Sequence, residues 1–139
     1  MRCVNKPRGE EGNAIVEFVG IVVVIVVPAL VLLIGLATTT SAQLALDDAA
    51  RQSARAYVRA DSAHAGEARG REAADRAWKD RGLSEPLSLD FLCSASPCLT
   101  PGAVVTARTS ATVTVPIIGA LALTGEQEMV VDQYRMVRP

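Results

Sequence analysis

Residues 18–37 read FVGIVVVIVVPALVLLIGLA, a run of twenty residues without a charged side chain. As an α-helix that rises about 1.5 Å per residue, this run would be about 30 Å long, which matches the hydrocarbon core of a bilayer. Buried helices of globular domains are seldom apolar on every side for this length, and a twenty-residue strand would be far too long. The sequence therefore predicts a transmembrane helix over residues 13–38.

The two sides of this run differ in their basic residues. Arg2, Lys6 and Arg8 lie in the leader MRCVNKPRGEEG (1–12), whereas the first charge on the other side is Asp47. Basic residues close to a membrane end favour the cytoplasmic side. We therefore expect a single-pass protein of the cytoplasmic (inner) membrane, with a cytoplasmic N-terminus and an extracytoplasmic C-terminal domain.

The three cysteines fit this orientation. Cys93 and Cys98 lie in CSASPC, and outside the cytoplasm such a pair is expected to form a disulfide, although two free thiols are the alternative. Cys3 would remain on the cytoplasmic side. A zinc site is not expected, because His64 is the only histidine and no second cysteine pair is present.

Composition argues against several classes of function. The 139-residue chain has a formal net charge of −1, so no overall basic field would attract nucleic acid. The sequence has no recognisable nucleophile–base–acid set, no glycine-rich phosphate loop and no metal-binding cluster. We therefore expect a protein that is not an enzyme and has no cofactor, no nucleic-acid partner and no small-molecule substrate.

Glu17 lies directly before the apolar run, about one turn inside the predicted helix. A charged side chain in the membrane costs a few kcal/mol at the bilayer centre and less near the edge, so it usually has a partner or a function. The simplest interpretation is a carboxylate at the headgroup level of an ordinary anchor.

The residues around Glu17 favour a more specific interpretation. Residues 12–18 read GNAIVEF, with a short basic leader before them and an unbroken apolar helix after them. This pattern resembles the class III signal peptide of type IV prepilins, and most closely that of the TadE-like minor pseudopilins of the tight-adherence (Tad/Flp) pilus system. The resemblance rests on Gly12, Glu17 and Phe18. The Ala- and Arg-rich stretch 42–60 and the β-rich C-terminal part are also similar to that family.

The resemblance implies a processing step and a set of partners. A prepilin peptidase would cut between Gly12 and Asn13, and Glu17 would pair with the new amino group of its own or a neighbouring subunit and set the axial register, with Phe18 beside it. The chain would then be a structural or assembly component of a pilus or related secretion machine, with incorporation into a cell-surface pilus as one outcome. Its partners would be the membrane, a secretion ATPase, an inner-membrane assembly platform, and sister pseudopilins or pilin.

Two alternatives remain open at this stage. Thr40 and Ala42 in TSAQ (40–43) resemble an ordinary secretory cleavage site, which would release residues 43–139 as a small secreted protein, although the apolar run is longer than most signal-peptide cores. If neither cut occurs, the chain would be a single-pass anchored protein whose extracytoplasmic domain binds another molecule.

The helical pattern continues beyond the membrane. Small residues recur at spacings of four and three and form one seam, which would pack either on the β region of this chain or on another subunit. We expect Gly66 and Gly70 to weaken the helix, a second helical piece over about 72–81, and an end at Gly82. The helical region is therefore 39–82, and the seam consists of Ala42, Leu46, Ala49, Ser53, Ala56 and Ala60.

Residues 83–139 show the alternation of strands. We predict strands over 87–93, 103–115 and about 126–137, with an apolar linker (116–125) whose role the pattern leaves undecided. The expected fold is α+β and pilin-like, in which a long N-terminal transmembrane helix continues into an amphipathic Ala-rich helix and is followed by a small antiparallel sheet of about three strands.

Overall fold

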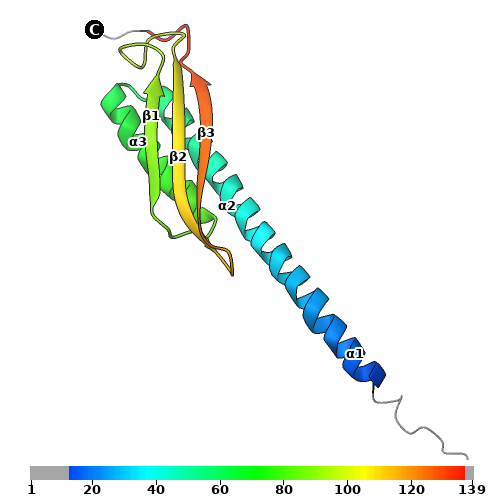
Figure 1. Ribbon diagram of the computed structural model, residues 1–139. Helices are drawn as coiled ribbons and strands as arrows, with labels where there is room; N and C mark the ends of the chain where they lie inside the picture. Colours follow the sequence, from blue (N-terminus) through cyan, green and yellow to red (C-terminus); the bar gives the residue numbers. More distant parts are fainter. Residues whose placement is uncertain (1–12, 137–139) are drawn as a thin grey trace, which may run out of the picture.

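A computed structural model describes residues 13–136 and shows one long helix whose C-terminal half carries a small sheet and a second helix (Figure 1). The fold is α+β, with the long helix first, the second helix next and the three-stranded sheet last. Its elements are α1 (Asn13–Ile21), the π-helical segment η1 (Val22–Val26), α2 (Val27–Val58), α3 (Ala63–Asp80), β1 (Leu87–Cys93), β2 (Val104–Val115) and β3 (Gly119–Val130).

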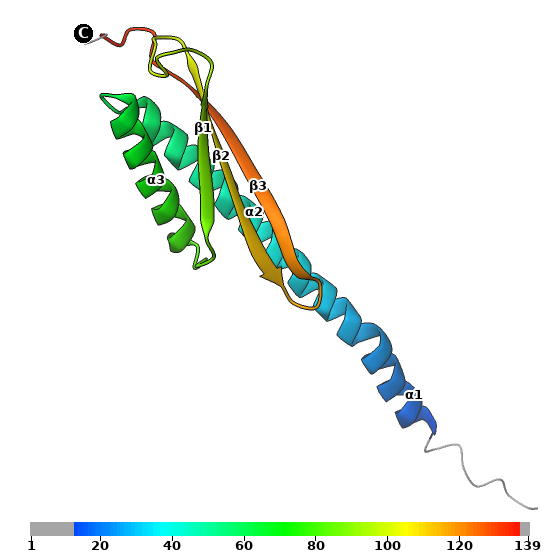
Figure 2. The ribbon, with the colours of Figure 1, turned by 60° about the vertical axis from the view of Figure 1, so that its left-hand side comes forward.

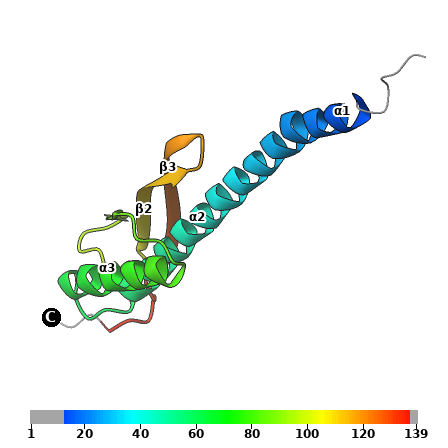
Figure 3. The same cartoon turned by 90° about the horizontal axis from the view of Figure 1, so that it is seen from below.

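The long helix changes its hydrogen bonding just before Pro28. A proline inside a helix removes one backbone N–H and crowds the preceding turn. Here the preceding turn is π-helical, and the N–H of Val27 donates to the carbonyl oxygen of Val22, five residues back. Figure 3 shows the axis of α1 turned away from that of α2, so a bend accompanies this π segment.

The sheet is antiparallel in the order β1-β2-β3, with β2 in the centre. Its side chains alternate between a buried and an exposed face. Helices α2 and α3 cover the buried face (Figure 2). Leu89, Ala107 and Val113 lie on the buried face, whereas Asp90 and Arg108 lie on the exposed one. The predictions for the first two strands agree with β1 and β2.

The prediction for the third strand is wrong in its position. β3 runs over Gly119–Val130 instead of about 126–137, so most of the expected linker 116–125 is strand and the turn shrinks to 116–118. Leu121 and Leu123 alternate with exposed residues as in any strand, and pairing with β2 over twelve residues outweighs the low strand propensity of the glycines. Val137, at the end of the predicted strand, lies outside the described residues.

The prediction for the second helix is also wrong at its start. α3 begins at Ala63 rather than near 72, and Ser62 caps it, because its Oγ accepts a hydrogen bond from the N–H of Ala65 at 3.2 Å. Gly66 and Gly70 lie inside α3 and are buried. The helix ends as predicted, since Gly82 follows it with φ +76° and its N–H donates to the carbonyl oxygen of Lys79.

Gly66 and Gly70 are the points where α3 meets aromatic rings. A Cβ atom at Gly66 would lie 3.1 Å from the Tyr57 ring, and one at Gly70 would lie 2.5 Å from Cζ of Phe91. The two rings pack on each other with centroids 4.6 Å apart. The glycines therefore allow close packing, which outweighs their low helix propensity.

The small-residue seam of α2 packs inside this chain. Its members contact the buried face of the sheet and α3, which is one of the two alternatives that the sequence left open. Ala56 is only partly buried, and Ala60 lies in the turn after α2. The fully buried members are Ala42, Leu46, Ala49, Ser53 and Ala60.

Candidate functional site

The N-terminal half of the long helix is not covered by the rest of the chain. Between Ala14 and Ile34 no residue is buried, and burial begins at Gly35. By length and composition, this is the one helix in the described part of the chain that could cross a membrane. An uncovered apolar surface of this size marks a contact with lipid or with other proteins. Its most exposed large residues are Ile15, Val16, Phe18, Val24, Leu32 and Leu33.

Glu17 lies near the start of this uncovered half. It is exposed on α1, and no other charged residue occurs between Asn13 and Leu46. None of the ion pairs within residues 13–136 involves Glu17. Phe18 beside it is 67% exposed. Asn13 is the first residue of α1, and Gly12, the other residue of the expected processing site, lies outside the described residues.

Three threonines follow the apolar run, and their hydroxyl groups are bonded within the helix. The Oγ1 atoms of Thr38, Thr39 and Thr40 each donate to the carbonyl oxygen four residues back, at 2.9 Å in every case. A threonine that bonds in this way exposes mainly its methyl group. This segment can therefore lie at the edge of an apolar phase without an unsatisfied donor.

The turn between β2 and β3 lies beside this part of the helix. A Cβ atom at Gly35 would be 3.4 Å from Cγ1 of Val115 and 3.6 Å from Cδ1 of Ile118. Ile117 and Ile118 are 83% and 64% exposed. This contact places the apolar residues 116–118 next to the apolar helix, which the sequence alone did not reveal.

The opposite end of the molecule contains the disulfide and the C-terminal segment. Cys93 and Cys98 are disulfide-bonded, and both pack around the core formed by Tyr57, Val105 and Val131. β1 ends at Cys93, and this end of the sheet is the one farthest from α1 (Figure 1). A cavity of about 650 Å³ at this end is lined by α2, the α2–α3 turn and the C-terminal segment.

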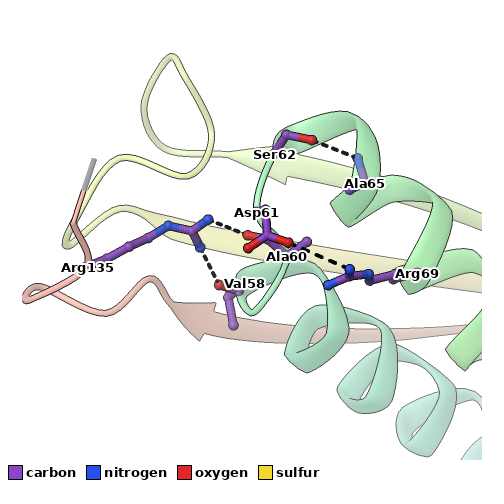
Figure 4. A network of polar contacts seen from close by, with 7 residues as sticks. All are labelled: Val58, Ala60, Asp61, Ser62, Ala65, Arg69 and Arg135. Carbon is purple, nitrogen blue, oxygen red and sulfur yellow. Dashed lines mark hydrogen bonds and ion pairs between the residues drawn. The ribbon is translucent and has the colours of Figure 1, made fainter. Parts of the chain in front are cut away.

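The side chain of Arg135 caps the C-terminal end of α2 (Figure 4). Its Nη1 donates to the carbonyl oxygen of Val58 at 2.9 Å, and its Nη2 donates to that of Ala60. A cation here satisfies carbonyl groups that the helix leaves unpaired. In the same turn Asp61 forms an exposed ion pair with Arg69 at 3.7 Å. Sequence reasoning missed Arg135, because the pattern places that residue in the third strand.

Comparison of the chain with protein-family models, with curated proteins and with solved structures finds no match. Within the described residues, no three His, Cys, Asp or Glu side chains are grouped so that they could hold a metal ion. A proposal for the function therefore rests on the uncovered helix and on the domain packed against its other half.

Proposed function

We propose that this chain is a TadE-like minor pseudopilin, a structural or assembly component of a Tad/Flp-type pilus or a related secretion machine. The observation that carries the proposal is the division of one continuous helix into two halves. Residues 14–34 are apolar apart from Glu17 and are uncovered, whereas 35–58 support a small α+β domain. A helix of this kind suits a subunit that is held in the membrane and contacts other subunits through its apolar half.

The uncovered half is long enough to cross a bilayer. Residues 14–34 would extend about 32 Å along the helix axis, compared with about 30 Å for the hydrocarbon core. In this orientation the N-terminus is cytoplasmic and the domain is extracytoplasmic, where the Cys93–Cys98 disulfide is stable. The chain would thus be a single-pass protein of the cytoplasmic membrane.

Glu17 is the residue that distinguishes this proposal from a plain anchor. A carboxylate at the membrane edge is costly without a partner, and the described residues offer it none. Cleavage between Gly12 and Asn13 would create an amino group four residues away, on the chain itself or on a neighbour. An ion pair in this low-dielectric setting is much stronger than at a surface and would set the register between subunits.

Release by cleavage after Ala42 receives less support from the geometry. Thr40–Gln43 lie within an unbroken helix, and Ala42 is fully buried. Gln43 is also engaged, since its Nε2 donates to the carbonyl oxygen of Thr124 at 2.8 Å. A cut at this point would divide the helix inside the segment that packs on the sheet.

A second candidate function is that of an anchored binding protein. The cavity of about 650 Å³ at the end of the domain farthest from α1 favours it, because a cavity of this size can hold a small ligand or a peptide side chain. In that case the N-terminal residues would remain on the mature chain.

The N-terminus of the mature chain tests these possibilities. The protein is isolated from membranes of cells with and without their prepilin peptidase, and its first residue is determined by mass spectrometry. A start at Asn13 that depends on the peptidase and is lost in Gly12→Val supports the pseudopilin, with Gly20→Val as the matched glycine control. An intact leader in wild-type cells favours the anchored binding protein, and a start at Gln43 favours release.

A further inference from the structure

The turn between β2 and β3 is apolar although it is exposed. It consists of Pro116, Ile117 and Ile118, and the two isoleucines are 83% and 64% exposed. In a water-soluble domain, turn positions usually carry Gly, Asn, Asp or Ser. Two adjacent exposed isoleucines at the tip of a hairpin therefore favour a contact outside the domain.

The backbone of Ile117 strengthens this point. Its φ is +70°, and a proline followed by a residue with positive φ is the pattern of a type II turn, in which glycine or asparagine is preferred at the second position. A β-branched residue in this conformation is a real outlier. An isoleucine at this position is unfavourable for the folded domain in water, so its apolar side chain needs another explanation.

The position of the turn indicates what it contacts. The turn lies against Gly35, which is two residues before the end of the apolar run at Ala37. The turn and the end of the run therefore differ in height by about 3 Å along the helix axis. Figure 2 shows that this turn is the part of the sheet that reaches farthest along α2 towards α1. If the apolar run spans a bilayer, the turn lies at the edge of the hydrocarbon core.

The distribution of charge on both elements agrees with this depth. The long helix has no charged residue from 18 to 46, and the hairpin has none from 109 to 125. The two uncharged segments end at the same level, because a Cβ atom at Gly125 would lie 3.0 Å from Oδ1 of Asp47. The next residues on the exposed face of the sheet, Arg108 and Glu126, form an ion pair at 2.9 Å.

We infer that the β2–β3 turn inserts into the lipid leaflet on the side of the membrane where the domain lies. Ile117 and Ile118 would then contact acyl chains next to the headgroups, and the domain would be held at two points, the helix and the turn. Two points of contact restrict the tilt and rotation of the domain relative to the membrane. This inference rests on the membrane-spanning part of the proposed function, and it does not depend on the processing step.

Fluorescence quenching in vesicles tests the insertion. The full chain with Cys3→Ser is reconstituted in phosphatidylcholine–phosphatidylglycerol vesicles, and an NBD fluorophore is attached to Val24→Cys, Ile118→Cys or Glu128→Cys. We expect nitroxide groups deep in the lipid to quench the label at residue 24, and nitroxide groups near the headgroups to quench the label at 118. The label at residue 128, at the other end of the same hairpin, should be quenched only by iodide in the aqueous phase.

Three other quenching results are possible, and each would overturn the insertion of the turn. If lipid nitroxides do not quench residue 24, the helix is not in the bilayer, and the proposed function fails together with the inference. If residue 24 is quenched by lipid while residue 118 responds only to iodide, the turn stays in water and only the inference is overturned. If residue 118 is shielded from both quenchers, another protein subunit covers the turn, which also overturns it.

Discussion

The side chain of Thr109 on the central strand is hydrogen-bonded to the backbone of the long helix at Leu46. Its Oγ1 lies 3.0 Å from the carbonyl oxygen of Leu46 and 3.3 Å from that of Gly125, and the residue is fully buried. Gly125 makes this contact possible, because a Cβ atom there would lie 2.9 Å from the carbonyl carbon of Leu46. The helix that continues from the apolar run is thus joined directly to the centre of the sheet.

Thr109→Val should therefore destabilise the domain. Valine has nearly the same shape but cannot donate, so the hydrogen bond from this hydroxyl is lost, and we expect a loss of about 1 kcal/mol. The matched control is Thr112→Val, which changes an exposed position on the same strand. Thermal unfolding in mild detergent, followed by circular dichroism, measures the difference. Equal melting temperatures for the two variants would show that the Thr109–Leu46 bond contributes nothing.

Gly70→Ala should destabilise the packing of α3 in spite of its higher helix propensity. Alanine gains about 1 kcal/mol in a helix, but its Cβ would lie 2.5 Å from Cζ of Phe91, and overpacking of this kind costs about 1–3 kcal/mol. We expect a net loss of stability in the same melting assay.

A double-mutant cycle identifies the clash as the cause. Phe91→Leu removes the ring atoms that the new methyl group of Gly70→Ala would meet, so Phe91→Leu should cost less in the Gly70→Ala background than in the wild-type chain. Additive effects of Gly70→Ala and Phe91→Leu would contradict the close approach of α3 to the Phe91 ring.

The local pattern of apolar and polar residues was sufficient to predict most elements of this fold. The apolar run predicted the long helix, and the alternation in 87–93 and 103–115 predicted β1 and β2 almost to the residue. The errors occur at glycines whose role depends on contacts distant in the sequence. Gly66 and Gly70 looked like helix breakers but are required by Tyr57 and Phe91, which belong to other elements.

The same reason explains what was missed at the candidate site. Glu17 could be proposed as a candidate from its place beside an apolar run, because that signal is local. The position of the apolar stretch 116–125 in the fold could not be predicted from neighbouring residues. Its contact with Gly35 joins residues about eighty positions apart. The hydrogen bonds from Arg135 to the end of α2 are equally distant in sequence.

Tyr57 should make stability depend on pH in the alkaline range. Burial, with a smaller contribution from the carboxylate of Glu67, raises the pKa of Tyr57 above its ordinary value. The folded chain therefore holds this proton more tightly than the unfolded chain, whose tyrosine ionises near pH 10. The stabilisation is complete below about pH 10 and is lost as the pH rises through the raised pKa, by up to about 1.4 kcal/mol per pH unit.

The two tyrosines of the chain provide their own comparison. Tyr57 is 1% exposed and Tyr134 is 91% exposed. A titration of tyrosinate absorbance should show a raised pKa that Tyr57→Phe removes, and Tyr57→Phe should also reduce the loss of stability above pH 10. Tyr134→Phe, which changes an exposed side chain, should leave both the raised pKa and the loss of stability unchanged. A Tyr57 that ionises near pH 10, as in the unfolded chain, would contradict its burial in the core.

Glu17→Gln should leave the chain in the membrane but weaken the association between subunits. The neutral amide removes a charge from the edge of an apolar segment, so insertion is at least as favourable as in the wild type. It also removes the proposed ion pair with the amino group of a cleaved neighbour, and breaking a buried pair costs about 3 kcal/mol, or about 100-fold in affinity. Energy transfer between labelled subunits in vesicles, measured against the protein-to-lipid ratio, gives this affinity.

A processing-deficient variant shows whether the amino group at Asn13 is the partner of Glu17. Gly12→Val should weaken association to a similar extent, and adding Glu17→Gln to it should have little further effect, because both changes remove the same ion pair. Glu128→Gln, which neutralises an exposed carboxylate on β3, serves as the control and should associate as the wild type does. Full association of Glu17→Gln subunits would mean that the carboxylate only lies at the headgroup level of an anchor.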